Sequence, residues 1–371
     1  MTSHKDYARL KRDDFVSLKG FDYIEFYVGN AHQAAHFYRT TFGFLPVAYA
    51  GLETGVRDRV SFIMEQGQIR LILTAATSPD SEVAEHVRLH GDGIKDIAFV
   101  VDDATQVFAV AVERGATPVM EPSLFEDEEC RLIKSTIATC GHTVHSFTQG
   151  DGPQRAFFPQ YQAMPKASQV LPTGLETIDH IAISVERGAL DQWIDFYKIV
   201  LGLHQSYQED IFTEYSAMNS KVVQNVNGSI KFPIMEPALG RRKSQIEEYL
   251  EFNHGPGAQH VALLSNSIVE TVRQLRENGI EFLRSPDTYY QALESRIGKI
   301  DEDIVSLRDL NILADRDQWG YLLQIFSKPI QSRPTLFIEI IQRAGARGFG
   351  AGNILALFEA VEREQAMRGN L

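Results

Sequence analysis

The chain has 371 residues, of which 44% are hydrophobic and 10% aromatic, which is enough for two globular domains and too apolar for a disordered protein. A formal net charge of −13 and a pI near 5.3 argue against nucleic acid or an anionic membrane as a partner, because both attract clustered Lys and Arg. We therefore expect the partner to be a small molecule or another subunit.

The N-terminal segment and the cysteines indicate the cellular location of the protein. Residues 1–20 lack the apolar core of a signal peptide, and no later apolar run reaches the length of a membrane span. Cys130 and Cys140 are the only cysteines, so the sequence predicts neither a disulfide framework nor a cysteine-rich metal site. These features together predict a cytoplasmic protein.

Two segments of the first half predict alternating strands and helices. Residues 21–44, "FDYIEFYVGNAHQAAHFYRTTFGF", indicate a strand followed by a helix. Residues 90–122 indicate a strand, an amphipathic helix, a glycine turn and a second strand. The Pro-, Gln- and Gly-rich segment 148–174 then predicts a linker, which places a domain boundary near residue 160.

The second half repeats both segments. Residues 177–203 match the first segment with a short insertion, and residues 254–286 align with the second segment without a gap. Each half is therefore expected to hold two strand-helix-strand modules. We predict two tandem domains, at residues 1–160 and 161–371.

Paired modules of this kind resemble the vicinal oxygen chelate superfamily, which includes the glyoxalases and dihydroxybiphenyl dioxygenases. The resemblance implies an α+β fold in which each domain is an open curled sheet built from paired βαβββ modules. It also implies that metal ligands, where a domain has them, lie on strands and point into the cleft of the sheet.

Three residues of the second half are candidate metal ligands. His180 in "IDHIAI" and His260 in "AQHVAL" occupy matching positions of the two modules, and Glu339 lies in the apolar run "LFIEII". A buried carboxylate costs several kcal/mol, in order of magnitude, unless it is paired or binds a metal. Two histidines and one carboxylate are the ligand set of non-haem Fe(II) oxygenases. The alternative is two hydrogen-bonded core histidines and a salt-bridged strand glutamate.

The first half offers a comparison, because its matching positions hold Tyr23 and Asp96 and no histidine. We therefore predict that only the second domain has a metal site, and that the first is a structural or assembly domain. A homodimer or homotetramer is the default expectation for such a chain.

A closer resemblance extends from about residue 20 to the end of the chain. The runs "EPALGRRKSQIEEYLEFNHGPGAQHVAL", "LADRDQWGYLLQIFSKPIQSRPTLFIEIIQR" and "GFGAGN" resemble 4-hydroxyphenylpyruvate dioxygenase and its sister enzyme 4-hydroxymandelate synthase. This resemblance implies that His180, His260 and Glu339 bind Fe(II), that dioxygen is the co-substrate, and that no separate 2-oxoglutarate is needed. It also implies that the helix predicted after "GFGAGN" closes the site, although an ordinary packing helix would have the same apolar face.

The resemblance extends to residues expected to contact an aryl-pyruvate substrate, with no catalytic residue beyond the metal centre. Buried amides need hydrogen-bonding partners, which a phenol or a carboxylate can supply. Taken singly, each amide could equally be a surface group and each aromatic a core residue. The matching positions are Ser220, Pro233, Met235, Gln245, Gln259, Gln324, Phe326, Phe349, Asn353 and Ile354.

Two departures concern the product. Members of the family that form homogentisate usually have Asn where this chain has Met235 and Phe where it has Ile354, whereas the mandelate synthases have aliphatic residues there. Pro233 and the ending "RGNL" resemble the homogentisate branch instead. We predict that 4-hydroxyphenylpyruvate is decarboxylated and hydroxylated at the benzylic carbon to give 4-hydroxymandelate and CO2. The alternative is homogentisate, formed in tyrosine catabolism.

Two other classes of protein share these modules. A non-catalytic small-molecule binding protein of the same fold would not need the three ligands. An extradiol dioxygenase or a glyoxalase would not account for the "GFGAGN" region. Metal analysis and oxygen uptake with an aryl-pyruvate distinguish these classes from the oxygenase.

Overall fold

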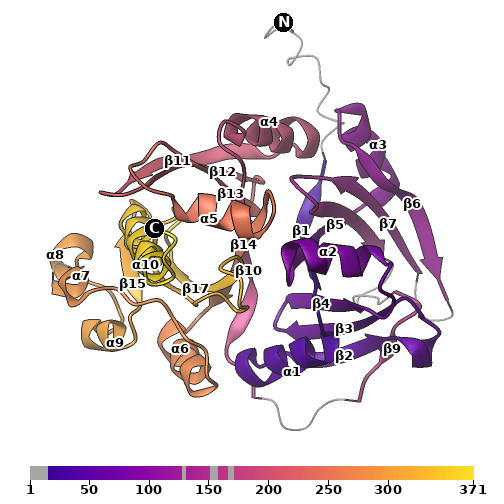
Figure 1. The fold of residues 1–371 in the computed structure, drawn as a ribbon, viewed down its shortest axis with the longest axis horizontal. Helices are drawn as coiled ribbons and strands as arrows, with labels where there is room; N and C mark the ends of the chain where they lie inside the picture. The colour runs from indigo at the N-terminus through magenta and orange to yellow at the C-terminus, as the bar shows by residue number, and fades with distance from the viewer. Residues whose placement is uncertain (1–15, 128–130, 151–157, 166–170, 292) are drawn as a thin grey trace, which may run out of the picture.

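The computed structural model describes residues 16–127, 131–150, 158–165, 171–291 and 293–371. Most of the N-terminal segment 1–20, Cys130 and parts of the predicted linker lie outside the described residues. The chain forms two curled sheets that lie next to each other, the first on the right of Figure 1 and the second on the left. The predicted α+β fold with two tandem sheets is confirmed.

The first sheet has nine strands in the order β6-β7-β8-β5-β1-β4-β3-β2-β9. Its elements are β1 (Leu18–Tyr27), α1 (Ala31–Phe42), β2 (Leu45–Ala50), β3 (Arg59–Gln66), β4 (Ile69–Ala76), α2 (Glu82–His90), β5 (Gly93–Val101), α3 (Ala104–Glu113), β6 (Pro118–Glu126), β7 (Arg131–Ala138), β8 (Val144–Gly150) and β9 (Gln162–Ala163).

The second sheet has eight strands in the order β11-β12-β13-β10-β14-β17-β16-β15. Its elements are β10 (Leu175–Ser184), α4 (Leu190–Leu201), β11 (His204–Phe212), β12 (Ala217–Gln224), β13 (Lys231–Pro237), α5 (Gln245–Phe252), β14 (Gly257–Ser265), α6 (Ile268–Glu277), α7 (Asp287–Gln291), α8 (Leu293–Ile297), α9 (Ile304–Asp309), β15 (Leu313–Arg316), β16 (Tyr321–Phe326), β17 (Phe337–Ala344) and α10 (Ala351–Met367).

The repeat is visible in how the first helix of each half ends. Helices α1 and α4 both end at a glycine with a left-handed backbone, Gly43 at φ 77° and Gly202 at φ 68°. A side chain at Gly43 would also bring its Cβ to within 2.7 Å of the Leu171 carbonyl oxygen. Glycine is favoured at these helix ends because it adopts positive φ without steric cost. In both halves the turn leads into a strand three places away in the sheet, β2 from β1 and β11 from β10.

The two halves share one hydrophobic core, built from the helix-covered faces of the sheets and from α1, α3, α4 and α6. Phe232 of the second sheet is completely buried and contacts Phe21 and Phe99 of the first, with ring centroids 5.8 and 6.1 Å away. Truncating such a residue to alanine costs about 3–5 kcal/mol of stability. The opposite, concave faces of the two sheets remain available for polar side chains.

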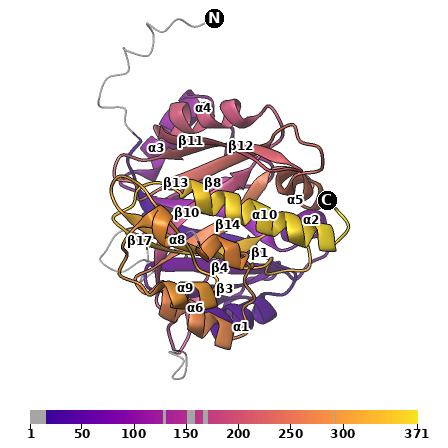
Figure 2. The same ribbon diagram turned by 90° about the vertical axis from the view of Figure 1, so that its left-hand side faces the viewer.

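Different segments close the two concave faces. In the first sheet, Phe158 and Tyr161, which follow β8, pack against Tyr23 and its neighbours. In the second sheet, α10 closes the face and packs against α5, β11 and β15 (Figure 2). The Gly-rich turn and helix predicted at the C-terminus are therefore present.

The linker differs from its prediction. Residues 148–150 complete β8, and β9 pairs with β2 at Ala48 and Tyr49, so the first sheet reaches residue 163. Residues 148–150 pair with β7, and β9 adds to β2 at one end of the sheet. The exact domain boundary stays a prediction. Within the described residues, the structure has no helix that combines the length and the apolarity needed to cross a membrane.

Candidate metal centre

The three predicted ligands come from neighbouring strands at the centre of the second sheet. His180 on β10 lies opposite Ala262 on β14, and Ala262 lies opposite Glu339 on β17. Residues directly opposite each other on paired strands point to the same face. His260 lies two residues before Ala262 and shares that face. Because Ala262 has only a methyl group, His180 and Glu339 can approach each other across it.

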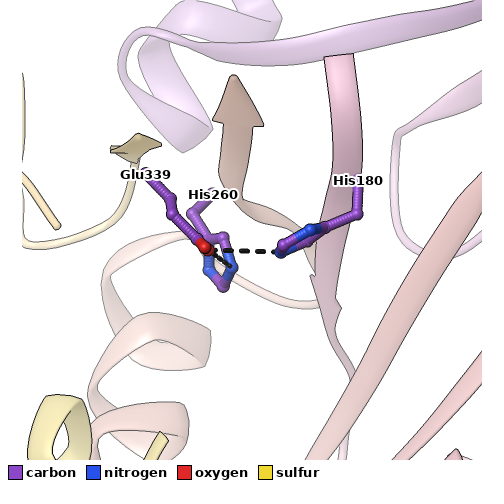
Figure 3. A group of neighbouring side chains, drawn as sticks. All are labelled: His180, His260 and Glu339. Atoms are coloured by element: carbon purple, nitrogen blue, oxygen red, sulfur yellow. Dashed lines mark ion pairs between the residues drawn. The ribbon is translucent and has the colours of Figure 1, made fainter. Parts of the chain in front are cut away.

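The ligand atoms converge in a small volume. The Nε2 atoms of His180 and His260 lie 3.2 and 3.5 Å from Oε2 of Glu339 (Figure 3). One ligand atom from each residue lies within 4.8 Å of the other two, and all three residues are buried. Bonds of about 2.1 Å at right angles to a metal place two donor atoms about 3.0 Å apart. The three residues therefore fit one metal ion.

The pKa values of the two histidines shift in opposite directions. Burial and the proximity of His180 hold the pKa of His260 well below its usual value, so its imidazole is neutral at pH 7, as metal binding requires. Burial also tends to lower the pKa of His180, but Glu339 and Asp179 outweigh burial and raise it. The carboxylate of Glu339 is 1% exposed and lies beside the two imidazoles.

A carboxylate orients His180 from behind. The Nδ1 atom of His180 lies 2.8 Å from Oδ1 of Asp179, and Arg343 donates two hydrogen bonds to Asp179 at 2.7 and 2.9 Å. Burial would raise the pKa of Asp179, but Arg343, His180 and Lys231 together hold it well below its usual value. Hydrogen-bonded carboxylates of this kind fix the ring orientation of a metal-ligating histidine.

A chain of amides holds Glu339 in place. Gln324 donates to Oε1 of Glu339 at 2.9 Å, and Asn353 on α10 donates to Oε1 of Gln324 at 2.8 Å. Tyr289 in turn donates to Oδ1 of Asn353 at 2.6 Å. The first residues of α10 are thus linked to the centre through buried hydrogen bonds.

A pocket opens directly from the three residues. The pocket brings together nine of the ten predicted substrate residues: Ser220, Pro233, Met235, Gln245, Gln259, Gln324, Phe326, Phe349 and Ile354.

Asn353 has a different place from the one predicted. Its side chain is completely buried, and it bonds Gln324 and Tyr289 behind the pocket wall. The neighbouring Ile354 faces the pocket instead, because successive residues of a helix point about 100° apart. Asn353 therefore supports a residue of the wall and does not form part of it.

The sequence prediction missed four lining residues, which are Tyr207, Met218, Val222 and Leu357. Three of them follow a periodicity that could have identified them. Met218 and Val222 lie two residues to either side of Ser220 on β12, and Leu357 lies one helical turn after Ile354. Tyr207 shows no such pattern.

Two phenylalanines flank the centre. The ring of Phe349 lies 5.1 Å from that of His180, and the ring of Phe326 lies 6.4 Å from that of His260. Arg343 donates to the Gly348 carbonyl oxygen at 2.7 Å and lies 5.5 Å from the Phe349 ring. The same arginine thus positions both Asp179 and the turn that bears Phe349.

Two family models match the chain. The model described as "Hydroxyphenylpyruvate dioxygenase, HPPD, N-terminal" matches residues 13–149. The model of the glyoxalase, bleomycin resistance protein and dioxygenase superfamily matches residues 177–325.

Curated relatives match along nearly the whole chain. A 4-hydroxyphenylpyruvate dioxygenase of Yarrowia lipolytica is 43% identical over 96% of this chain and 94% of its own. A second one, from Danio rerio, is 44% identical over 100% of this chain and 96% of its own.

Among solved structures, a mutant of 4-hydroxymandelate synthase from Streptomyces coelicolor superposes with a TM-score of 0.85. It is 38% identical, and the match covers 94% of this chain and 99% of that one. The protein therefore belongs to the 4-hydroxyphenylpyruvate dioxygenase family of non-haem iron dioxygenases, within the glyoxalase and dioxygenase superfamily.

Proposed function

We propose that the protein uses Fe(II) and dioxygen to decarboxylate and hydroxylate 4-hydroxyphenylpyruvate. The observation that carries this proposal is the direct opening of one pocket onto the His180, His260 and Glu339 centre. His180, His260 and Glu339 would hold the iron, which when bound supplies the activation of dioxygen and the chelation of a 2-oxo acid. Because the substrate carries its own 2-oxo acid, a separate 2-oxoglutarate is not needed.

The residues of the pocket would bind and shield the substrate. Phe326 and Phe349 provide apolar faces on both sides of the centre for an aromatic ring. Gln245 has a buried Oε1 atom without a protein partner, which suits a polar group of a ligand. Leu357 on α10 lines the same pocket, so α10 would exclude water from the reacting groups.

We infer the product, 4-hydroxymandelate, from the side chains that form the pocket wall. Met235 and Ile354 belong to one apolar cluster with Phe358 and both line the pocket. The ring carbon and the benzylic carbon of the substrate lie about one bond apart, so a small rotation of the ring decides which one reacts. Each such pocket change is worth about 1–3 kcal/mol of discrimination. A flexible Met and a short Ile would allow the rotation that gives 4-hydroxymandelate.

Homogentisate is the second candidate product, and the names of the relatives favour it. Five curated relatives, 42–44% identical to this chain, are called 4-hydroxyphenylpyruvate dioxygenase, whereas the synthase structure is 38% identical. Pro233, which resembles the homogentisate branch, lines the pocket beside Met235. Both candidates have the same substrate and the same metal centre.

Product analysis tests the proposal. The Fe(II)-loaded protein is incubated with 4-hydroxyphenylpyruvate and oxygen, and the product is separated against 4-hydroxymandelate and homogentisate standards. The double variant Met235→Asn, Ile354→Phe should shift the product ratio toward homogentisate by about 10-fold or more. Leu355→Phe is the matched control, because Leu355 is exposed beside Ile354 and should leave the ratio unchanged.

The outcomes separate the parts of the proposal. Homogentisate as the sole product of the unmodified protein would overturn the mandelate assignment and keep the substrate. Stoichiometric iron without turnover of 4-hydroxyphenylpyruvate would overturn the substrate. A protein that binds no iron would support a non-catalytic member of the fold.

A further inference from the structure

Two rows of opposed residues on β11, β12 and β13 form one wall of the pocket. Directly opposed residues share a face of the sheet. The first row is Tyr207, Val222 and Pro233, and the second is Glu209, Ser220 and Met235. All of them except Glu209 line the pocket. The wall is therefore apolar at β13 and polar at β11, the edge strand.

A β-bulge turns Tyr207 toward the pocket. Gln205 pairs with Val223, yet Tyr207 pairs with Val222, so Ser206 is an extra residue in β11. Without this bulge, Tyr207 would lie opposite Lys221 and face away from the pocket. Bulges are frequent next to functional sites, where they re-aim a side chain. The local backbone thus brings an aromatic hydroxyl onto the pocket wall.

Hydrogen bonds hold the Tyr207 hydroxyl in a defined orientation. It donates to Oε2 of Glu209 at 2.6 Å, and Ser220 donates to the backbone carbonyl oxygen of Glu209 at 3.0 Å. Burial, together with Glu209, raises the pKa of the Tyr207 phenol, so it keeps its proton at neutral pH. Because that proton is directed at Glu209, the oxygen of Tyr207 can accept a hydrogen bond from a ligand.

Two other side chains near this wall are rival acceptors. The Ser220 hydroxyl donates to the Glu209 carbonyl oxygen, so its oxygen could also accept a hydrogen bond. Gln245, on α5, has a buried Oε1 atom without a protein partner. Gln324 instead bonds both Glu339 and Asn353, and Met235 offers no hydrogen bond of comparable strength.

We propose that Tyr207, oriented by Glu209, accepts a hydrogen bond from the ring hydroxyl of the substrate and thereby selects 4-hydroxyaryl-pyruvates over unsubstituted aryl-pyruvates. This inference rests on the proposed function. Tyr207 is a specificity-determining residue, and Glu209 positions it. The aromatic ring of Tyr207 lies 6.2 Å from that of Phe349, which flanks the centre, so a substrate ring beside Phe349 is within reach of Tyr207.

The test compares kcat/KM for 4-hydroxyphenylpyruvate and phenylpyruvate in the unmodified protein and in Tyr207→Phe. The variant should lose about 10-fold in kcat/KM for the hydroxylated substrate and stay within about two-fold for phenylpyruvate. Glu209→Gln should show the same selective loss at about three-fold, and it carries the test if Tyr207→Phe does not fold. Tyr215→Phe is the matched control, because Tyr215 is an exposed tyrosine that should leave both values unchanged.

The outcomes distinguish the role of Tyr207 from the proposed function. Equal losses for both substrates, or no loss, would overturn the role of Tyr207 while the proposed function stands. Selective loss in Gln245→Leu with none in Tyr207→Phe would assign the hydroxyl to Gln245 instead. Absence of turnover of either substrate by the iron-loaded unmodified protein would overturn the proposed function and this inference together.

Discussion

The two sheets place different side chains at three matching positions of their concave faces. The first sheet has Tyr23, Asp96 and Ser146 there, and the second has His180, His260 and Glu339. In the first sheet the three side chains bond one another, since Tyr23 and Ser146 both donate to Oδ2 of Asp96, at 3.0 and 2.6 Å. In the second set both imidazoles lie beside the Glu339 carboxylate, and all three residues line a pocket.

The difference extends to the charge beside each carboxylate. Lys134 pairs with Thr148, two residues after Ser146, and Gln324 pairs with Ile341, two residues after Glu339, so Lys134 and Gln324 occupy matching positions. The ammonium of Lys134 lies 3.0 Å from Asp96, whereas Gln324 offers Glu339 a neutral amide. The first sheet supplies its own cation, and the second would leave its carboxylate to an external one. One backbone arrangement thus gives a closed polar cluster or a candidate metal centre.

The largest effect is expected from removing the carboxylate of the second set. Glu339→Ala should lose iron and at least about 1000-fold in turnover, because the metal holds and activates the reactants. Ser146→Ala, the matched change in the first sheet, should keep turnover within about two-fold. Anaerobic iron loading followed by oxygen uptake measures both. Stoichiometric iron in Glu339→Ala would show that Glu339 is not a ligand.

The next effect concerns stability. Lys134→Met should lower the free energy of unfolding by about 3 kcal/mol, because it leaves the buried carboxylate of Asp96 without its cation. The double variant Lys134→Met, Asp96→Asn should recover part of that loss. Denaturant unfolding measures both, and iron content should not change in either. Loss of iron in Lys134→Met would mean that the two sites are coupled.

Much of the fold and of the centre could be predicted from the sequence because the chain repeats itself. His180 and His260 occupy matching positions of apolar strands, and Glu339 lies in another such strand. A polar side chain there either faces a cleft or is buried at a cost in stability. Tyr207 could not be predicted, since the bulge at Ser206 breaks the alternation of β11.

The position of Asn353 behind the pocket wall could not be predicted for a related reason. A motif fixes which residues are adjacent in sequence but not which of them faces the pocket at the start of a helix. The end of the first sheet could not be predicted either, because the edge strand β9 has only two residues and so shows no periodicity.

A lysine at position 324, as at the matching position 134 of the first sheet, tests the effect of a positive charge beside Glu339. Gln324→Lys should place an ammonium beside Glu339 and lower the affinity for Fe(II) by about 30-fold, since the lysine would compete with the metal for the carboxylate. Gln324→Met is the matched control for the lost amide and should have a smaller effect. Anaerobic Fe(II) titration measures the affinity. Equal losses in the two variants would show that the amide matters and the charge does not.

The smallest effect concerns the aspartate that directly precedes Tyr23 in the first sheet and His180 in the second. These residues are Asp22 and Asp179. Each carboxylate is near an arginine, Arg70 at 3.5 Å from Asp22 and Arg343 at 2.7 Å from Asp179, but only Asp179 also bonds a candidate ligand. Asp179→Asn should lower Fe(II) affinity by about 10-fold, because a neutral amide orients and polarises His180 less well.

Asp22→Asn should leave Fe(II) affinity unchanged, and the same titration compares the two variants. If both variants lost iron equally, the aspartates would act through the shared core and not through the bond to His180. A loss confined to Asp179→Asn would show that the same aspartate and arginine pair serves stability alone in the first sheet and positions a metal ligand in the second.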